Sequence, residues 1–145
     1  MRTVETDEGE RLLLVKESSD ASLVRDPKTG EERYVEAEQL SEPGGSSPLV
    51  AAAGGVPEPV RRLLTAVHDE RSLGLVMEVA DRGPVAVVDL LAAYELCESD
   101  FHGLLSELRA AGLVREATVA GERGYDATET ARAAVDLLRP TESTE

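Results

Sequence analysis

The sequence has no tryptophan, one phenylalanine, three tyrosines and one cysteine. With so few aromatic side chains, a hydrophobic core has to consist of leucine, valine and alanine, which suits helix packing. The single cysteine excludes an intramolecular disulfide and indicates a reducing compartment. No apolar run approaches the roughly 18 residues of a membrane span, and residues 1–10 contain no hydrophobic signal region. We therefore expect a cytoplasmic protein without a membrane segment.

Lysine is also scarce. The chain carries 29 acidic and 15 basic residues, and only Lys16 and Lys28 are lysines. A net charge of −14 makes the folded chain repel itself in dilute buffer, and concentrated salt screens that repulsion. This composition predicts a cytosolic protein of a halophile. The alternative is an acidic protein of an ordinary organism that avoids nucleic acid.

Several motifs of catalysis and cofactor binding are missing. No Gly-Lys pair occurs, which excludes a P-loop, and the G-x-G-x-x-G spacing is absent. The two histidines, His68 and His102, belong to different predicted elements and supply too few ligands for a metal site. Cys97 is expected to be a small buried cysteine; the alternative is a redox-sensing thiol whose pKa is lowered by a helix N-terminus. We expect no enzymatic activity, no cofactor and no metal.

The first 40 residues have the pattern of a small antiparallel β meander. Strands are expected around Val4 and at 12–15, 22–25 and 33–35, because turn residues separate these runs, and one helical turn is expected at 36–40. Residues 41–56 are rich in glycine, proline, serine and alanine and carry a single charge. That composition predicts a flexible linker.

From residue 57 to residue 139 the apolar residues recur at helical spacing. Helices are predicted from 57, from about 70 to 83, over 87–95 and from 128 to the residue before Pro140. The residues predicted to face inward are Leu63 and Leu64 in the first helix, Leu73, Val76, Met77 and Ala80 in the second, and Val88, Leu91 and Ala92 in the third. Residues 140–145 are expected to form a disordered tail.

The most informative stretch runs from residue 98 to residue 126. Apolar residues at i, i+3, i+4 and i+7 predict one buried helix face, made of Phe101, Leu104, Leu105 and Leu108. Ser99 is a plausible N-cap, and Gly112 stands where a left-handed residue would end the helix. Residues 113–119 then alternate, and Gly121 and Gly124 bracket a turn. A helix followed by a two-stranded wing is therefore predicted.

The helix exit AAGLV, the glycine-bracketed hairpin and a closing helix that opens on DATETARAA resemble the winged helix-turn-helix superfamily. The likeness is greatest to the MarR, ArsR and PadR groups of regulators and covers about residues 57–139. The chain is also similar to small winged-helix proteins of halophilic archaea. The expected fold class is thus α+β, with a small N-terminal antiparallel β meander, a Gly/Pro/Ser linker and a C-terminal winged helix-turn-helix.

This resemblance implies a DNA-binding transcriptional regulator of a halophilic archaeon. Helix 98–111 would enter the major groove and wing 113–126 would touch the backbone or the minor groove of double-stranded DNA. The implied DNA-binding residues are Ser99, His102, Ser106, Arg109, Arg115 and Arg123. The resemblance also implies a homodimer formed through the first and last helices of the C-terminal domain.

The central groove-facing positions depart from the usual pattern of a DNA-binding helix. They contain no lysine or arginine and include the carboxylate of Asp100, although phosphate neutralisation normally supplies much of DNA affinity. In molar salt counterion release contributes little, and base edges and shape could carry recognition. The alternative is a winged-helix protein-protein interaction module that does not contact DNA and that binds a protein partner, together with the N-terminal β domain.

Overall fold

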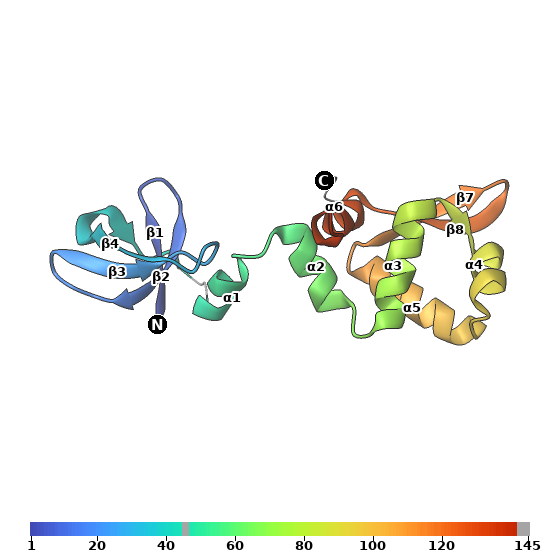
Figure 1. The fold of residues 1–145 in the computed structure, drawn as a ribbon, viewed down its shortest axis with the longest axis horizontal. Helices are drawn as coiled ribbons and strands as arrows, with labels where there is room; N and C mark the ends of the chain where they lie inside the picture. The colour runs from blue at the N-terminus through green and yellow to red at the C-terminus, as the bar shows by residue number, and fades with distance from the viewer. Residues whose placement is uncertain (45–46, 142–145) are drawn as a thin grey trace. The chain divides into compact units, whose positions relative to one another are not determined.

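The computed structural model describes residues 1–44 and 47–141, and the chain divides into two compact units between Pro57 and Glu58 (Figure 1). Most of the tail expected at 140–145 lies outside the described residues. In the part of the chain that is described, no helix is long and apolar enough to cross a membrane. The fold class is α+β, as predicted, with an antiparallel sheet in the first unit and helices followed by a β-hairpin in the second.

The first unit is an antiparallel meander of four strands, followed by a short fifth strand that pairs with the first. Its strands are β1 (Arg2–Thr6), β2 (Arg11–Lys16), β3 (Ala21–Arg25) and β4 (Glu32–Glu36). After the 3₁₀ turn η1 (Ala37–Gln39), the short β5 (Leu40–Ser41) pairs with β1, which gives the order β4-β3-β2-β1-β5. The meander and the helical turn are confirmed, whereas β5 was not predicted because a two-residue strand has no periodicity of its own.

Alternating apolar side chains build the core of this unit. Val4, Leu12, Leu14 and Val24 form one buried cluster, because residues two apart on a strand point to the same face of the sheet. Leu13 points to the other face and is also buried. The helix α1 (Pro48–Ala53) packs against β1 and β2.

Helix α1 lies inside the segment 41–56 that the sequence predicts as a linker. Its N-cap is Ser47, whose hydroxyl accepts a hydrogen bond from the backbone N–H of Leu49 at 3.3 Å, and Pro48 follows at the first helical position. Both residue types favour a helix start. Overall composition indicated a flexible linker, but the local cap and the alanines that follow it produce a short helix.

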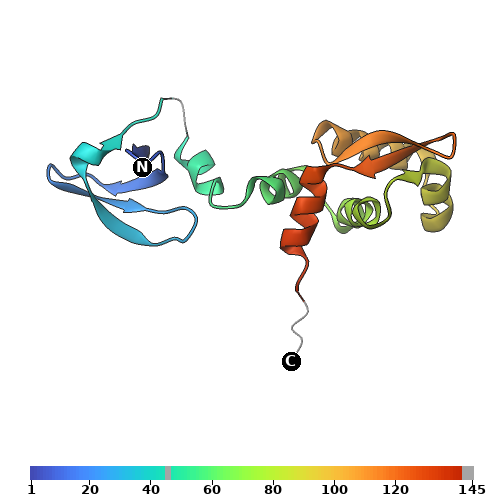
Figure 2. The same cartoon turned by 90° about the horizontal axis from the view of Figure 1, so that it is seen from above.

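The second unit consists of five helices and a three-stranded sheet with the order β6-β8-β7. It contains, in chain order, α2 (Glu58–Ala66), α3 (Glu70–Arg82), β6 (Val85–Ala86), α4 (Val87–Tyr94), α5 (Glu98–Ala110), β7 (Val114–Val119), β8 (Glu122–Ala127) and α6 (Glu129–Leu138). A three-residue turn joins α4 to α5, and Glu95 in that turn adopts a left-handed conformation with φ of 50°. Helix-turn-helix followed by hairpin and closing helix is the winged-helix arrangement, and Figure 2 shows the hairpin of β7 and β8 reaching from α6 to the side of this unit where α4 lies.

Buried side chains fix which helix faces point inward. Phe101, Leu105 and Leu108 of α5 are at most 1% exposed, as predicted, whereas Leu104, the fourth residue of the predicted face, is only partly buried. Two other helices are rotated relative to the prediction. In α3 the buried residues are Ser72, Leu75, Val76 and Val79, while Leu73 is exposed; in α4 Leu90 is buried and Val88 is 55% exposed. In α2, Leu63 is buried and Leu64 is exposed.

The hairpin turn consists of Ala120 and Gly121, with φ values of 50° and 80°. Two consecutive positive φ angles define the tight turn that matches the twist of a two-stranded hairpin. Gly124, which was predicted to bracket this turn, instead lies buried within β8, opposite Ala86 of β6. A Cβ atom at this glycine would collide with the carbonyl group of Val85. The lack of a side chain at Gly124 therefore allows β6 to pair closely with β8.

Candidate nucleic-acid interface

One face of α5 is polar and exposed. Ser99, His102, Ser106 and Arg109 follow one another at spacings of three, four and three residues, which places them along a single face of the helix. The two serines and Arg109 are exposed, and the His102 side chain is 41% exposed. The structure therefore brings together four of the six residues that the sequence proposed for DNA contact.

The N-terminus of α5 differs from the prediction. The helix begins at Glu98, so its N-cap is Cys97, which makes no side-chain capping bond, and Ser99 lies in the first turn. Cys97 is exposed rather than buried, and its sulfur lies 3.2 Å from the Ser99 hydroxyl. That hydrogen bond, together with the backbone N–H groups of Asp100 and Ser99, lowers the pKa of the Cys97 thiol.

The C-terminus of α5 leads directly into the wing. Gly112 has φ of +76°, as predicted for the residue after the helix. Its N–H donates to the carbonyl of Arg109 at 3.0 Å, and the N–H of Leu113 donates to the carbonyl of Leu108 at 2.9 Å. This pair of bonds is the Schellman motif. It turns the chain sharply into β7 and so fixes the wing beside the end of the helix.

The wing arginines lie on the hairpin and are exposed. Arg115 is on β7, and its guanidinium lies 3.2 Å from Asp126 on the paired strand. Arg123 is on β8 and donates to the hydroxyl of Tyr125 at 3.1 Å and to Glu116 at 3.2 Å. The hydrogen bond to Tyr125 and the electrostatic attraction of the same side chain raise the pKa of Arg123, and Glu116 adds a smaller effect in the same direction.

Arg109 of α5 also reaches the wing, because its guanidinium donates to the same oxygen of Glu116 at 2.9 Å. All three arginines of the predicted interface are therefore paired with carboxylates. The sequence did not identify Glu116 or Asp126 as their partners. For Asp126 the two-residue hairpin turn sets a register that places it opposite Arg115 and could have revealed the pair.

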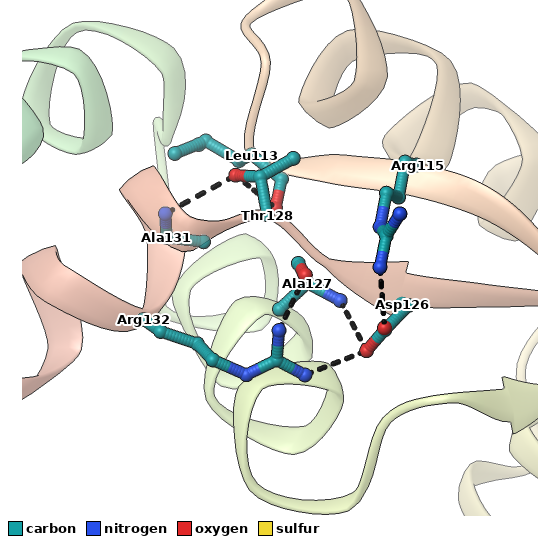
Figure 3. A network of polar contacts seen from close by, with 7 residues as sticks. All are labelled: Leu113, Arg115, Asp126, Ala127, Thr128, Ala131 and Arg132. Atoms are coloured by element: carbon teal, nitrogen blue, oxygen red, sulfur yellow. Dashed lines mark hydrogen bonds and ion pairs between the residues drawn. The ribbon is translucent and has the colours of Figure 1, made fainter.

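Asp126 anchors the base of the wing to α6 (Figure 3). Its side chain, which is 11% exposed, accepts from Arg132 at 2.6 Å, from Arg115 at 3.2 Å and from the backbone N–H of Ala127 at 2.9 Å. Arg132 also donates to the carbonyl of Ala127 at 2.7 Å. Burial by itself raises the pKa of Asp126, but the hydrogen bond from Arg132, the attraction of its charge and the further donors outweigh burial and lower that pKa.

Thr128 joins the same base of the wing to the helix that follows. Its hydroxyl donates to the carbonyl of Gly112 at 2.7 Å. The same hydroxyl lies 3.3 Å from the carbonyl of Leu113 and accepts from the N–H of Ala131 at 3.2 Å, which caps α6 (Figure 3). The end of α5, the base of the wing and the start of α6 are therefore held together at Thr128.

Replacing Asp126 by asparagine tests the contribution of this network to stability. Because hydrogen bonds to a charged group are lost, we expect the free energy of unfolding of the variant to be about 1–3 kcal/mol lower than that of the wild type at neutral pH. A carboxyl group with a lowered folded-state pKa stabilises the fold above its unfolded pKa of about 3.9 and loses that effect as pH falls through the folded value. The stability difference should therefore shrink progressively below about pH 4, as measured by urea unfolding across pH. The control is Asp136→Asn on the exposed side of α6, and equal loss in both variants would contradict this role.

Nothing in the described ranges suggests a metal centre, since no group of three or more histidine, cysteine, aspartate or glutamate side chains could hold an ion there. Glu98 and His102 do approach each other on α5, at 3.6 Å. Two ligands do not make a site.

Comparisons with known proteins give one family and one solved structure. The family model described as "Family of unknown function (DUF7346)" matches residues 1–139. The crystal structure of a transcriptional regulator, HlyU from Vibrio vulnificus CMCP6, is similar at 29% sequence identity and a TM-score of 0.46, over 53% of this chain and 80% of the HlyU chain. No curated protein matches.

Proposed function

The chain belongs to the DUF7346 family, and from the geometry of its second unit we propose that it is a DNA-binding transcriptional regulator without enzymatic activity. It reads double-stranded DNA with α5 in the major groove and the β7–β8 wing on the adjacent backbone. The residues assigned to this contact are Ser99, His102, Ser106, Arg109, Arg115 and Arg123.

One observation supports this proposal above the others. The exposed face of α5 carries serine, histidine and arginine at helical spacing, and its last turn passes through a Schellman motif into a hairpin whose arginines face solvent. Serine and histidine side chains hydrogen-bond base edges, while arginines contact phosphates. The buried face of the same helix holds it rigidly on the core, as a reading helix requires.

We further propose that the protein works in the cytoplasm of a halophilic archaeon, where concentrated salt screens its net charge of −14. In such salt, phosphate neutralisation contributes little to affinity. Few basic residues are then needed, and recognition depends on base edges and groove shape. The two lysines of the whole chain fit this view.

A homodimer through α2 and α6 is the proposed assembly. These two helices pack against each other, and they carry three exposed leucines, Leu64, Leu137 and Leu138, at 58%, 58% and 49% exposure. Exposed apolar side chains on adjoining helices are what an interface between two copies would cover.

Leu137→Glu is expected to split this dimer, because it places a charge in the apolar contact. In sedimentation equilibrium the mass should fall from twice 15.5 kDa to 15.5 kDa. Val88→Glu, at an exposed valine of α4, is the control and should leave the dimer intact. A wild-type protein that sediments as a monomer at every concentration would contradict the proposal.

The second candidate function is a winged-helix module that binds another protein. It is favoured by the ion pairs of the interface arginines. Each of Arg109, Arg115 and Arg123 is paired with a carboxylate, so none of these three guanidinium groups is unpaired. The first unit offers a surface for such a partner, because Tyr34 on β4 is 71% exposed beside a cavity of about 490 Å³.

The DNA and the proteins that the chain retains from a cell extract distinguish the two candidate functions. Tagged protein is captured in about 1 M KCl, where the Debye length is about 3 Å, and the bound DNA is sequenced while bound proteins are identified. Enrichment of particular DNA fragments, reproduced by fluorescence anisotropy with purified components, supports the regulator. Recovery of one protein partner with no enriched DNA supports the interaction module.

A further inference from the structure

Glu116 is a residue of β7 in the wing, and its side chain lies between Arg109 of α5 and Arg123 of β8. One oxygen of its carboxylate accepts from Arg109 of α5 at 2.9 Å and from Arg123 of β8 at 3.2 Å. Two guanidinium groups from separate elements therefore converge on a single anionic oxygen. All three side chains are about half exposed, so the arrangement is open to a ligand from solvent.

Arg123 is held in place independently of Glu116. It donates to the hydroxyl of Tyr125, and its guanidinium carbon lies 5.8 Å from the centre of the Tyr125 ring. Tyr125 is only 4% exposed, so a rigid residue of the core orients this arginine. Arg123 is thus preorganised without the glutamate, whereas the side chain of Arg109 is oriented by Glu116.

Convergent guanidinium groups are suited to a phosphate oxygen as well as to a carboxylate oxygen. On the DNA-binding surface proposed above, they stand where the end of the helix meets the wing, which is where a backbone strand would pass. The carboxylate of Glu116 supplies the anionic oxygen in the unbound protein.

We propose that Arg109 and Arg123 form a binding site for a DNA backbone phosphate and that Glu116 occupies this site in the free protein, so that DNA has to displace its carboxylate. This inference rests on the proposed DNA-binding function and adds to it a built-in competitor. The competitor lowers the affinity for every duplex by the same factor. Stable binding therefore needs the contacts of α5 in addition to those of the phosphate site.

Glu116→Gln removes the competing charge while keeping the size of the side chain. Since DNA no longer has to displace a carboxylate from two weak, exposed ion pairs, we expect this variant to bind DNA about threefold to tenfold more tightly than the wild type. The probe is a fluorescein-labelled mixed-sequence duplex, because phosphate contacts carry no sequence information. Anisotropy titrations in moderate salt give the dissociation constants, and circular dichroism checks that each variant is folded.

Glu122→Gln is the matched control. Glu122 is an exposed carboxylate of the same hairpin for which no ion pair is found among the described residues, and its loss should change affinity by less than about twofold. The gain from Glu116→Gln should also vanish in a protein that carries Arg109→Ala and Arg123→Ala, since the site no longer exists.

Three results would overturn the inference. Equal affinity of the wild type and Glu116→Gln would show that the carboxylate does not compete, while leaving the proposed function intact. A gain that persists without the two arginines, or that Glu122→Gln reproduces, would reduce the effect to overall charge. A complete absence of DNA binding in every variant would remove the proposed function and the inference together.

Discussion

Leu108→Ala is expected to lower the free energy of unfolding of the second unit by about 2–5 kcal/mol. Leu108 is 1% exposed and lies on the inner face of α5, about one turn after Leu105 and about two turns after Phe101. Truncation removes apolar contacts and leaves a cavity that the surrounding helices can only partly fill. The recognition helix would then lose the packing that holds it, so unfolding of α5 should accompany the drop.

The matched control for this variant is Leu137→Ala, which removes the same atoms from a side chain that is 58% exposed. Its effect should stay within about 0.5 kcal/mol in the monomer. Urea unfolding in concentrated KCl, followed by circular dichroism at low protein concentration, measures both values. Similar losses for the two leucines would mean that α5 is not packed into a core, and the winged-helix description of residues 58–139 would fail.

Local chemistry explains why many boundaries could be predicted from the sequence. Gly112 ends α5 because glycine adopts the left-handed conformation there without the steric cost of a Cβ atom. In the first unit, turn residues at 7–9 and 26–30 fixed the hairpins, and alternating leucines and valines fixed the strands. Each of these features depends only on residues close together in the chain, so it can be recognised from the sequence without the tertiary structure.

The inward faces of α3 and α4 could not be predicted in the same way. In α3, both the stripe that contains Leu73 and the one that contains Leu75 have helical spacing, and the neighbours of the helix decide which is buried. For α4 the choice between Val88 and Leu90 has the same cause. Periodicity identifies a helix, whereas tertiary packing sets its rotation.

The candidate interface shows the same division. The spacing of Ser99, His102 and Ser106 was sufficient to place them on one helix face. The pairing of Arg109 with Glu116 required knowledge of how the end of α5 approaches β7. Such contacts join elements whose relative position depends on the whole unit, so the sequence alone predicted the arginines but not what holds them.

We propose above that the exposed face of α5 and the wing form the surface that binds DNA. Changing Ser106 and Arg123 to glutamate together puts two carboxylates on that surface and removes one guanidinium. We expect DNA affinity to fall by about two orders of magnitude, because a base-reading position would be blocked and a guanidinium in direct contact with DNA would be replaced by a carboxylate.

The control carries the same change in charge away from the interface, as Ser19→Glu in the first unit and Arg71→Glu near the start of α3, where both positions are exposed. The decisive measurement is the anisotropy binding curve of wild type, variant and control against the DNA fragment most enriched from the cell extract, recorded in about 1 M KCl. We expect the wild type and the control to bind and the Ser106→Glu, Arg123→Glu variant to lose about 100-fold in affinity. Binding curves that coincide for all three proteins would show that DNA binds another surface, which would contradict the assignment of α5 and the wing as the DNA-binding surface.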